Sequence, residues 1–122
     1  MKLHHIAIWT FRLEELKEFY VRFLGGKSNE KYVNPKKGFE SYFISFGEGP
    51  SLELMSRPDV QNTVVEENRV GLTHLAFTFP ARRKFFVSLR KCVPKVTPLP
   101  VSRALRETAI LKVSSLTRTG TV

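Results

Sequence analysis

Two short segments of this chain repeat each other at a constant offset of 69 residues, and this repeat limits the possible folds more than any other feature. Residues 3 and 5–8 read Leu and His-Ile-Ala-Ile, whereas residues 72 and 74–77 read Leu and His-Leu-Ala-Phe. Both segments are rich in β-branched and aromatic residues, which is typical of strands. Because a repeat at a fixed offset indicates a repeated structural unit, we expect two copies of one unit, the second beginning at Leu72.

The segment between the two repeats predicts the rest of the first unit. Residues 12–24 place apolar side chains at helical spacing, with Thr10 able to cap the start and Gly25-Gly26 able to end the helix. Residues 28–33, 40–46 and 51–55 each predict a short strand, and a turn at residues 47–50 separates the last two. The first unit is therefore expected to be β-α-β-β-β over residues 1–56, followed by a polar linker over residues 57–70.

Three side chains that can bind metals occupy matching positions of the predicted strands: His5, Glu53 and His74. Because side chains alternate across a strand, each of the three points away from its bulky apolar neighbours. Two imidazoles and a carboxylate suit Zn, Ni, Fe or Mn, and strands hold such ligands rigidly. His4 lies on the opposite side of its predicted strand, so we expect it to be packed or solvated.

Each of these residues also has a simpler interpretation. A lone histidine in a strand is more often a hydrogen-bonded structural residue than a metal ligand. Glu53, taken alone, fits a solvated strand position. The match between His5 and His74 in the repeat favours the metal site over these alternatives.

All of the excess positive charge lies in the last third of the chain. There are 20 Lys and Arg against 11 Asp and Glu, a net charge of +9. Residues 1–79 contain 10 of each kind, so residues 80–122 hold 10 basic residues and one acidic residue, Glu107. Such a tail could bind nucleic acid in a salt-sensitive way. However, only two aromatic residues, Phe85 and Phe86, accompany the charges for base stacking, so we do not expect nucleic acid as a partner.

Cysteine usage and hydropathy indicate the compartment. Cys92 is the only cysteine, so no disulfide can form within the chain and a reducing compartment fits best. The first residues contain no long apolar stretch of the kind found in secretion signals, and no window approaches the roughly 18 apolar residues of a membrane-spanning helix. We therefore expect a cytoplasmic protein that does not enter the membrane.

Four motifs within residues 1–79 resemble those of glyoxalase I-like proteins of the vicinal oxygen chelate superfamily, which also contains bleomycin resistance proteins and extradiol dioxygenases. The motifs are Leu-His-His-Ile-Ala-Ile at residues 3–8, Phe-Tyr-x-x-Phe-Leu-Gly at 19–25, Leu-Glu-Leu at 52–54 and Thr-His-Leu-Ala at 73–76. The resemblance implies an α+β fold of paired β-α-β-β-β modules around a divalent metal that chelates substrate oxygens. It matches His5, Glu53 and His74 to three metal ligands. The fourth ligand, a glutamate on the final strand of the second module, has no counterpart, so no catalytic residue is assigned.

The second module of the family does not continue beyond Phe79 in the sequence as written. The family often carries Gly-Asp-Gly-Tyr and Asp-Pro-Asp-Gly-Asn-Arg segments near its end. The third base of each codon can be read together with the first two bases of the next codon, starting at Arg106 and Glu107. The residues that this shifted reading frame permits include both segments. We therefore predict a frameshift between about Phe79 and Lys84, which leaves the second module incomplete or disrupted. An authentic basic tail is the alternative.

These observations predict one domain over residues 1–122, with a first module at 1–56, a linker at 57–70, the start of a second module at 71–79 and a basic tail at 80–122. The resemblance implies a glyoxalase-like metalloprotein, similar to lactoylglutathione lyase or to the dioxygenases, acting on a small oxygen-chelating substrate. The missing glutamate leaves an inactive form as an open possibility. A metal-free small-molecule-binding or resistance module of the same fold is the alternative. Family members commonly pair modules within or between chains, which implies a homodimer.

Overall fold

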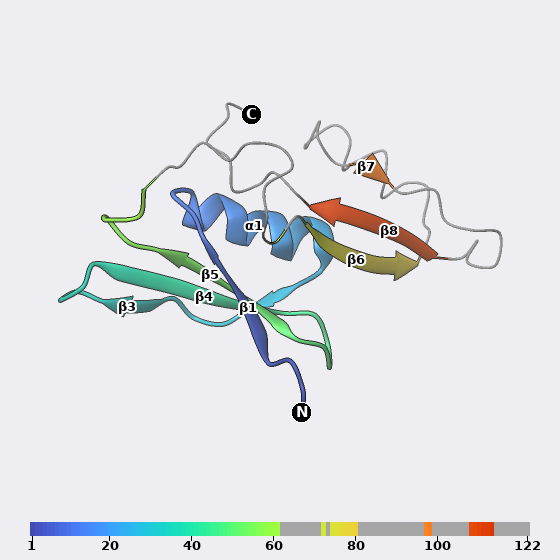
Figure 1. The fold of residues 1–122 in the computed structure, drawn as a ribbon, viewed down its shortest axis with the longest axis horizontal. Helices are drawn as coiled ribbons and strands as arrows, with labels where there is room; N and C mark the ends of the chain where they lie inside the picture. Colours follow the sequence, from blue (N-terminus) through green and yellow to red (C-terminus); the bar gives the residue numbers. More distant parts are fainter. Residues whose placement is uncertain (62–71, 73, 81–96, 99–107, 114–122) are drawn as a thin grey trace. The chain divides into compact units, whose positions relative to one another are not determined.

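The chain falls into two units, which are described separately. The computed structural model describes residues 1–61, 72, 74–80, 97–98 and 108–113. Unit 1 spans Met1–Val64 and unit 2 spans Val65–Val122 (Figure 1). Most of the expected linker and most of the expected basic tail lie outside the described residues. So does much of the segment in which we predict a frameshift, and that hypothesis stays a prediction.

Helix α1 spans Leu13–Leu24 and buries one apolar side, as its spacing predicts. Gly25 ends the helix in the left-handed conformation, with φ of 69°, which glycine adopts without steric cost. The expected cap at Thr10 is wrong in detail, because Arg12 occupies the N-cap position. Thr10 Oγ1 instead accepts a hydrogen bond of 3.0 Å from the Arg12 backbone N–H and so shapes the turn before the helix. Within the described residues, no helix is long and apolar enough to cross a membrane.

Unit 1 contains a five-stranded mixed sheet. Its strands are β1 (His5–Trp9), β2 (Lys27–Ser28), β3 (Tyr32–Asn34), β4 (Phe39–Ser45) and β5 (Ser51–Ser56). The order is β1-β5-β4-β2, and β3 also pairs with β4. β1 runs parallel to β5, whereas the other pairs are antiparallel. The predicted α+β class and the β-α-β-β-β order of the first module are confirmed, with one strand divided in two.

The division between β2 and β3 falls within the strand expected at residues 28–33. Asn29 lies at the break, and its side-chain Oδ1 accepts a hydrogen bond of 2.7 Å from the Phe43 backbone N–H. The Asn29 backbone N–H in turn donates to the Phe43 carbonyl at 3.1 Å. An asparagine side chain therefore takes a place that a backbone carbonyl holds in a regular ladder, and the strand is interrupted there.

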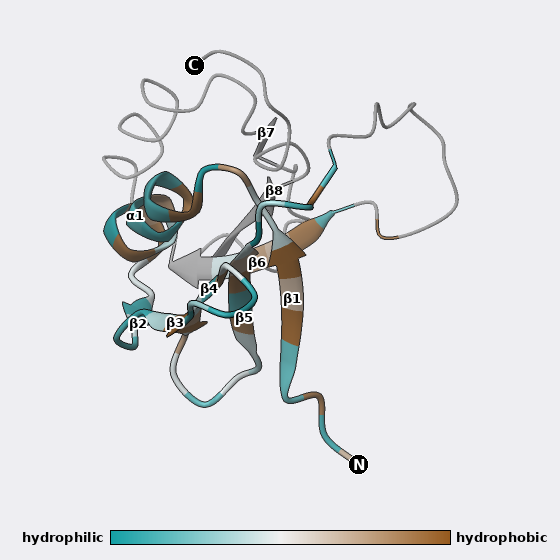
Figure 2. Ribbon diagram, turned by 90° about the vertical axis from the view of Figure 1, so that its left-hand side faces the viewer, coloured by the Kyte–Doolittle hydropathy of each residue, from teal (hydrophilic) through white to brown (hydrophobic). Residues whose placement is uncertain are grey.

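The core of unit 1 lies between α1 and one side of the sheet, here called the helix face. Its sheet residues are Ile6, Ile8, Tyr42, Ile44, Leu52 and Leu54. Ile44 and Leu54 are fully buried, as is Tyr20 of α1, and α1 contacts both β4 and β5. Figure 2 shows hydrophobic and hydrophilic residues alternating along the turns of α1. Burial of each large apolar side chain stabilises the fold by about 1.5–3 kcal/mol, so this face carries much of the stability of unit 1.

Gly26 lets the end of α1 approach β4 closely. A Cβ atom added at Gly26 would lie 2.4 Å from Ile44 Cγ2 and 3.0 Å from Phe46 Cε1. The Gly26 backbone N–H donates to the Tyr20 carbonyl at 3.1 Å, which satisfies one of the free carbonyls at the helix end. A larger side chain at residue 26 would therefore push the helix away from the sheet.

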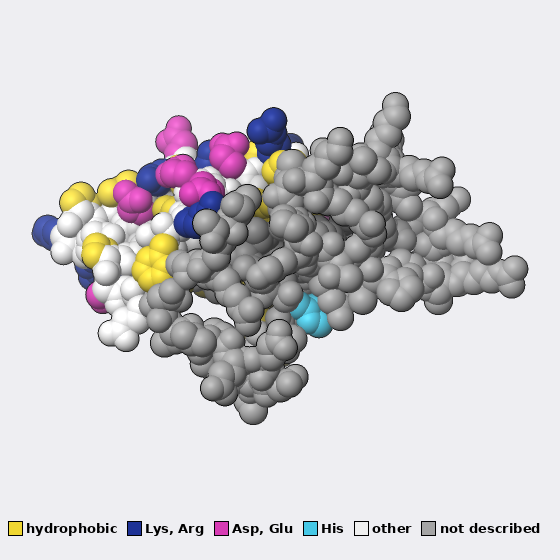
Figure 3. All heavy atoms as spheres, turned by 90° about the horizontal axis from the view of Figure 1, so that it is seen from above, with side chains coloured by type: hydrophobic (Ala, Val, Ile, Leu, Met, Phe, Trp, Pro, Cys, Tyr) yellow, Lys and Arg dark blue, Asp and Glu magenta, His cyan; other side chains and the backbone are white. Residues whose placement is uncertain are grey.

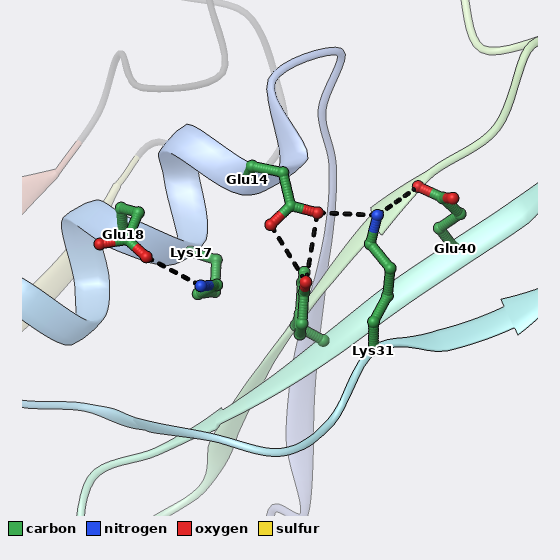
Figure 4. A network of polar contacts seen from close by, with 6 residues as sticks. Glu14, Lys17, Glu18, Lys31 and Glu40 are labelled. Carbon is green, nitrogen blue, oxygen red and sulfur yellow. Dashed lines mark hydrogen bonds and ion pairs between the residues drawn. The ribbon is translucent and has the colours of Figure 1, made fainter.

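A polar network joins α1 to the sheet at the rim of the helix face (Figure 4). Lys31 Nζ lies 2.7 Å from Glu14 Oε1 and 2.9 Å from Glu40 Oε2. The Tyr42 hydroxyl donates to Glu14 Oε2 at 3.0 Å. The hydrogen bond from Lys31 lowers the pKa of Glu14, and the two carboxylates raise the pKa of Lys31. Figure 3 shows acidic and basic side chains intermixed on the described part of the surface that it presents.

Unit 2 contains, among its described residues, a three-stranded antiparallel sheet. Its strands are β6 (Leu75–Pro80), β7 (Thr97–Pro98) and β8 (Thr108–Val113), in the order β6-β8-β7. The repeat predicts that the second unit begins at Leu72, but β6 begins three residues later, so His74 lies directly before it. Leu75 and Phe77 are half-buried whereas Ala76 and Thr78 are exposed, which confirms the expected alternation for these four residues.

Candidate functional site

The side of the five-stranded sheet opposite the helix face is here called the His5 face. Its residues are His5, Ala7 and Trp9 of β1, Ser51, Glu53 and Met55 of β5, and Phe39, Ser41 and Phe43 of β4. The parallel register places His5 beside Ser51 and Ala7 beside Glu53. His5 and Glu53 thus share a face, and the buried Leu52 and Leu54 point to the other side, as alternation predicts.

His5 and Glu53 approach each other on this face. His5 Nε2 lies 3.7 Å from Glu53 Oε2, and the two side chains are 38% and 16% exposed. In a tetrahedral metal site with bonds of about 2.1 Å, a nitrogen and an oxygen ligand would lie roughly 3.4 Å apart. The pair therefore needs only a small adjustment to bind one divalent ion, and it remains accessible to solvent.

Two neighbours of His5 were not expected from the sequence. The Phe43 ring lies edge-on to the His5 ring, with centroids 5.5 Å apart and an interplanar angle of 78°. Phe43 is found only through the β4–β5 register, in which it pairs with Glu53. The other neighbour is His4, whose Nδ1 lies 2.8 Å from His5 Nδ1. His4 is exposed, in agreement with the expectation that it is packed or solvated, but its contact with His5 was not expected because His4 precedes β1, which begins at His5.

Aromatic rings form a row at the other end of the His5 face. The Trp9 and Phe39 ring centroids are 6.1 Å apart, and those of Phe39 and Tyr32 are 6.0 Å apart. The Arg57 guanidinium lies 5.5 Å from the Trp9 ring centroid and also pairs with Asp59. Trp9 and Tyr32 are exposed. This row offers an apolar surface, with one cation beside it, that can contact part of a small molecule.

His74, the third predicted ligand, is half-buried and belongs to unit 2. Its partnership with His5 and Glu53 rests on the sequence repeat and stays a prediction. Among the described residues, no group of three or more His, Cys, Asp or Glu side chains could hold a metal ion. The geometry of unit 1 therefore supplies two donors of the expected set.

The sequence of this chain is similar to those of known proteins. The sequence profile of the Glyoxalase/Bleomycin resistance protein/Dioxygenase superfamily matches residues 4–97. The chain is also 34% identical over 76 residues to the uncharacterized protein YwkD of Bacillus subtilis (strain 168), which is 62% of this chain and 59% of that protein. The alignment thus spans less than two thirds of the length of that relative.

Two solved structures show a similar fold. The trypanothione-dependent glyoxalase I of Leishmania major has a TM-score of 0.56 and 19% identity, covering 85% of this chain and 73% of that chain. A glyoxalase family protein from Enterococcus faecalis has a TM-score of 0.59 and 20% identity, covering 93% of this chain and 89% of that chain. At such identities the likeness concerns the fold alone.

Proposed function

The chain belongs to the glyoxalase/bleomycin resistance protein/dioxygenase superfamily, and we propose that it is a glyoxalase-like metalloprotein acting on a small oxygen-chelating substrate through a bound divalent metal. The observation that carries this proposal is the 3.7 Å approach of His5 Nε2 to Glu53 Oε2 on one face of the sheet. His5 and Glu53 would hold the metal, and His74 is proposed as a third ligand. Zn, Ni, Fe and Mn all suit imidazole and carboxylate donors.

The residues of the His5 face fit this role in unit 1. His5 and Glu53 stand on two paired strands, so the backbone sets their separation before a metal binds. When bound, the metal would supply Lewis acidity toward substrate oxygens. Ala7 lies between His5 and Trp9 on the same face, and its small side chain leaves room for a ligand above the strand. The aromatic row that begins at Trp9 would contact the apolar part of that ligand.

The reaction proposed is a lyase reaction of the glyoxalase I kind, with dioxygenase-like chemistry as the second possibility. The support is the fold shared with the glyoxalase I of Leishmania major, which is described as trypanothione-dependent. A thiol adduct of an α-keto aldehyde is the substrate class that this chemistry implies. Because the sequence offers no counterpart of the fourth ligand, the first test concerns metal binding and precedes any assay of turnover.

A metal-free binding module of the same fold is the second candidate function. The observation that favours it is the row of Trp9, Phe39 and Tyr32 rings, of which Trp9 and Tyr32 are exposed, with the Arg57 cation against Trp9. Such a surface could hold a planar or anionic small molecule by stacking and charge, with His5 and Glu53 as ordinary polar groups.

We also propose that the protein is a homodimer. In the described part of unit 1, β1 ends the strand order and pairs with β5 alone. An unpaired edge favours association with a second sheet. Sedimentation analysis should show a dimer at micromolar concentration, and a monomer across the accessible range would contradict this.

The proposed function is tested by titrating chelator-treated protein with Zn, Ni, Fe(II) and Mn in a calorimeter. We expect one metal per chain. Affinity should fall by more than about 100-fold in His5→Ala and Glu53→Gln, since even outer-shell partners of a metal typically contribute 10–100-fold. Glu48→Gln is the matched control, because it removes a carboxylate from the turn after β4. His74→Ala tests the third ligand in the same way. No binding by the wild-type protein, or equal affinity in Glu53→Gln, would favour the metal-free module.

A further inference from the structure

The contact between His4 and His5 bears on which nitrogen of His5 is free to bind a metal. The two Nδ1 atoms lie 2.8 Å apart, a normal hydrogen-bonding distance. The rings meet edge to face, with centroids 5.1 Å apart. Because both atoms are ring nitrogens, one must carry the hydrogen and the other must offer its lone pair.

The direction of this hydrogen bond determines the state of the remaining nitrogen of His5. Nε2 faces Glu53 Oε2 at 3.7 Å. If His5 accepts from His4, a neutral His5 carries its hydrogen on Nε2, which blocks that nitrogen as a ligand. If His5 donates, Nε2 has a free lone pair directed to the side of Glu53.

A backbone hydrogen bond holds His4 beside His5. The Ser51 N–H donates to the His4 carbonyl at 3.0 Å, which ties the residue before β1 to the start of β5. Phe43 lies edge-on against the His5 ring and limits its rotation. The His4 backbone and the His5 ring are therefore both restrained by the sheet that carries Glu53.

We propose that His4 is a positioning residue for metal binding: its Nδ1 accepts the Nδ1–H of His5 and leaves His5 Nε2 free to ligate the metal with Glu53. This inference rests on the proposed function. Metal-bound imidazoles generally donate their second N–H to such an acceptor, which sets the tautomer and the ring orientation. His4 itself is not a ligand and does not touch the substrate.

The expected effect on metal affinity is about tenfold, the lower end of the 10–100-fold range for such partners, because the His4–His5 contact is exposed to solvent. His4→Ala should show the full loss. His4→Asn should retain most of the affinity, because the asparagine side-chain oxygen can take the place of Nδ1 as acceptor. Lys2→Ala is the control for a change in the chain before β1.

The test combines these titrations with long-range ¹H–¹⁵N spectra of the histidine rings in metal-free protein at about pH 8.5, where imidazoles are ordinarily neutral. We expect Nδ1–H at His5 in the wild type and in His4→Asn, and a shift toward Nε2–H in His4→Ala. The role of His4 is overturned by Nε2–H at His5 in the wild type, or by unchanged metal affinity in His4→Ala. Failure of the wild type to bind any metal would overturn the proposed function instead, and the ring spectra would still decide the direction of the hydrogen bond.

Discussion

The two faces of the five-stranded sheet in unit 1 differ in kind, although the same strands build both. The helix face holds fully buried apolar side chains such as Ile44 and Leu54 against α1. The His5 face holds an imidazole and a carboxylate 3.7 Å apart, at partial exposure, and a row of rings. Leu54 and Glu53 are adjacent in sequence, yet they belong to different faces because side chains alternate along β5.

Stability and ligand chemistry are therefore separated at the level of single residues. The helix face contains the groups that exclude water, and their removal leaves cavities. The His5 face contains groups that would bind a ligand, and their removal leaves solvated space. Substitutions at neighbouring positions should therefore affect different properties.

The largest expected effect is the loss of packing at Leu54. Leu54→Ala should lower the free energy of unfolding by about 2–5 kcal/mol, because a fully buried leucine leaves a cavity under α1. Urea denaturation followed by circular dichroism measures this change. Glu53→Ala, one residue away, should cost less than about 1 kcal/mol. Similar losses for both variants would show that the two faces are not energetically distinct.

A smaller effect is expected where α1 meets β4 at Gly26. Gly26→Ala should cost about 1–3 kcal/mol, because the new Cβ would lie 2.4 Å from Ile44 Cγ2 and must displace it. Gly49→Ala is the control, since a Cβ there meets nothing within 4 Å. Thermal unfolding of both variants gives the comparison. Equal melting temperatures for the two would mean that the helix face tolerates expansion at this point.

The smallest effect concerns the polar rim of the helix face. Lys31→Ala should lower the free energy of unfolding by about 0.5 kcal/mol near pH 7, since the ion pairs are half-exposed and screened. The pKa of Glu14 lies below its ordinary value of 4.5 because of Lys31, so the stabilisation is present above that pH and disappears as pH falls through the folded-state pKa.

The deficit of Lys31→Ala relative to wild type should therefore shrink in acid, as urea melts between about pH 7 and pH 3 would show. Lys36→Ala removes the same charge from the turn at residues 35–38 and should show no such trend. A deficit that grows in acid would contradict the assignment of the Glu14–Lys31 pair.

Local signals explain how much of the fold could be predicted. The apolar spacing and the glycine at residue 25 mark the end of α1, so its bounds could be read almost to the residue. The break between β2 and β3 could not, because it depends on Asn29 bonding to Phe43, 14 residues away. The start of β6 could not be predicted either. β6 begins at Leu75 because its pairing with β8 begins there, with Val113 as the partner of Leu75.

In the candidate site too, local sequence predicts some features, whereas others depend on contacts between distant segments. Alternation within a strand was sufficient to place His5 and Glu53 on one face. It could not show that Phe43 would lie against His5, because that requires the register between β4 and β5. Nor could it show the contact of His4, which depends on where β1 begins. The role of His74 as a third ligand stays a prediction from the sequence repeat.

Unfolding three proteins with and without metal shows whether Glu53 belongs to a metal site while the side chains of the helix face belong to the core. Metal at about 100 times its dissociation constant should stabilise the wild type by about 2.7 kcal/mol. Ile44→Val, which loses about 0.5–1.5 kcal/mol of packing on the helix face, should keep that full increment. Glu53→Gln should match the wild type in chelator and gain less than about 0.4 kcal/mol from the same metal concentration, because its affinity is more than about 100-fold lower. A full metal increment in Glu53→Gln would show that Glu53 is not a metal ligand, and its loss in Ile44→Val would show that the two faces are not independent.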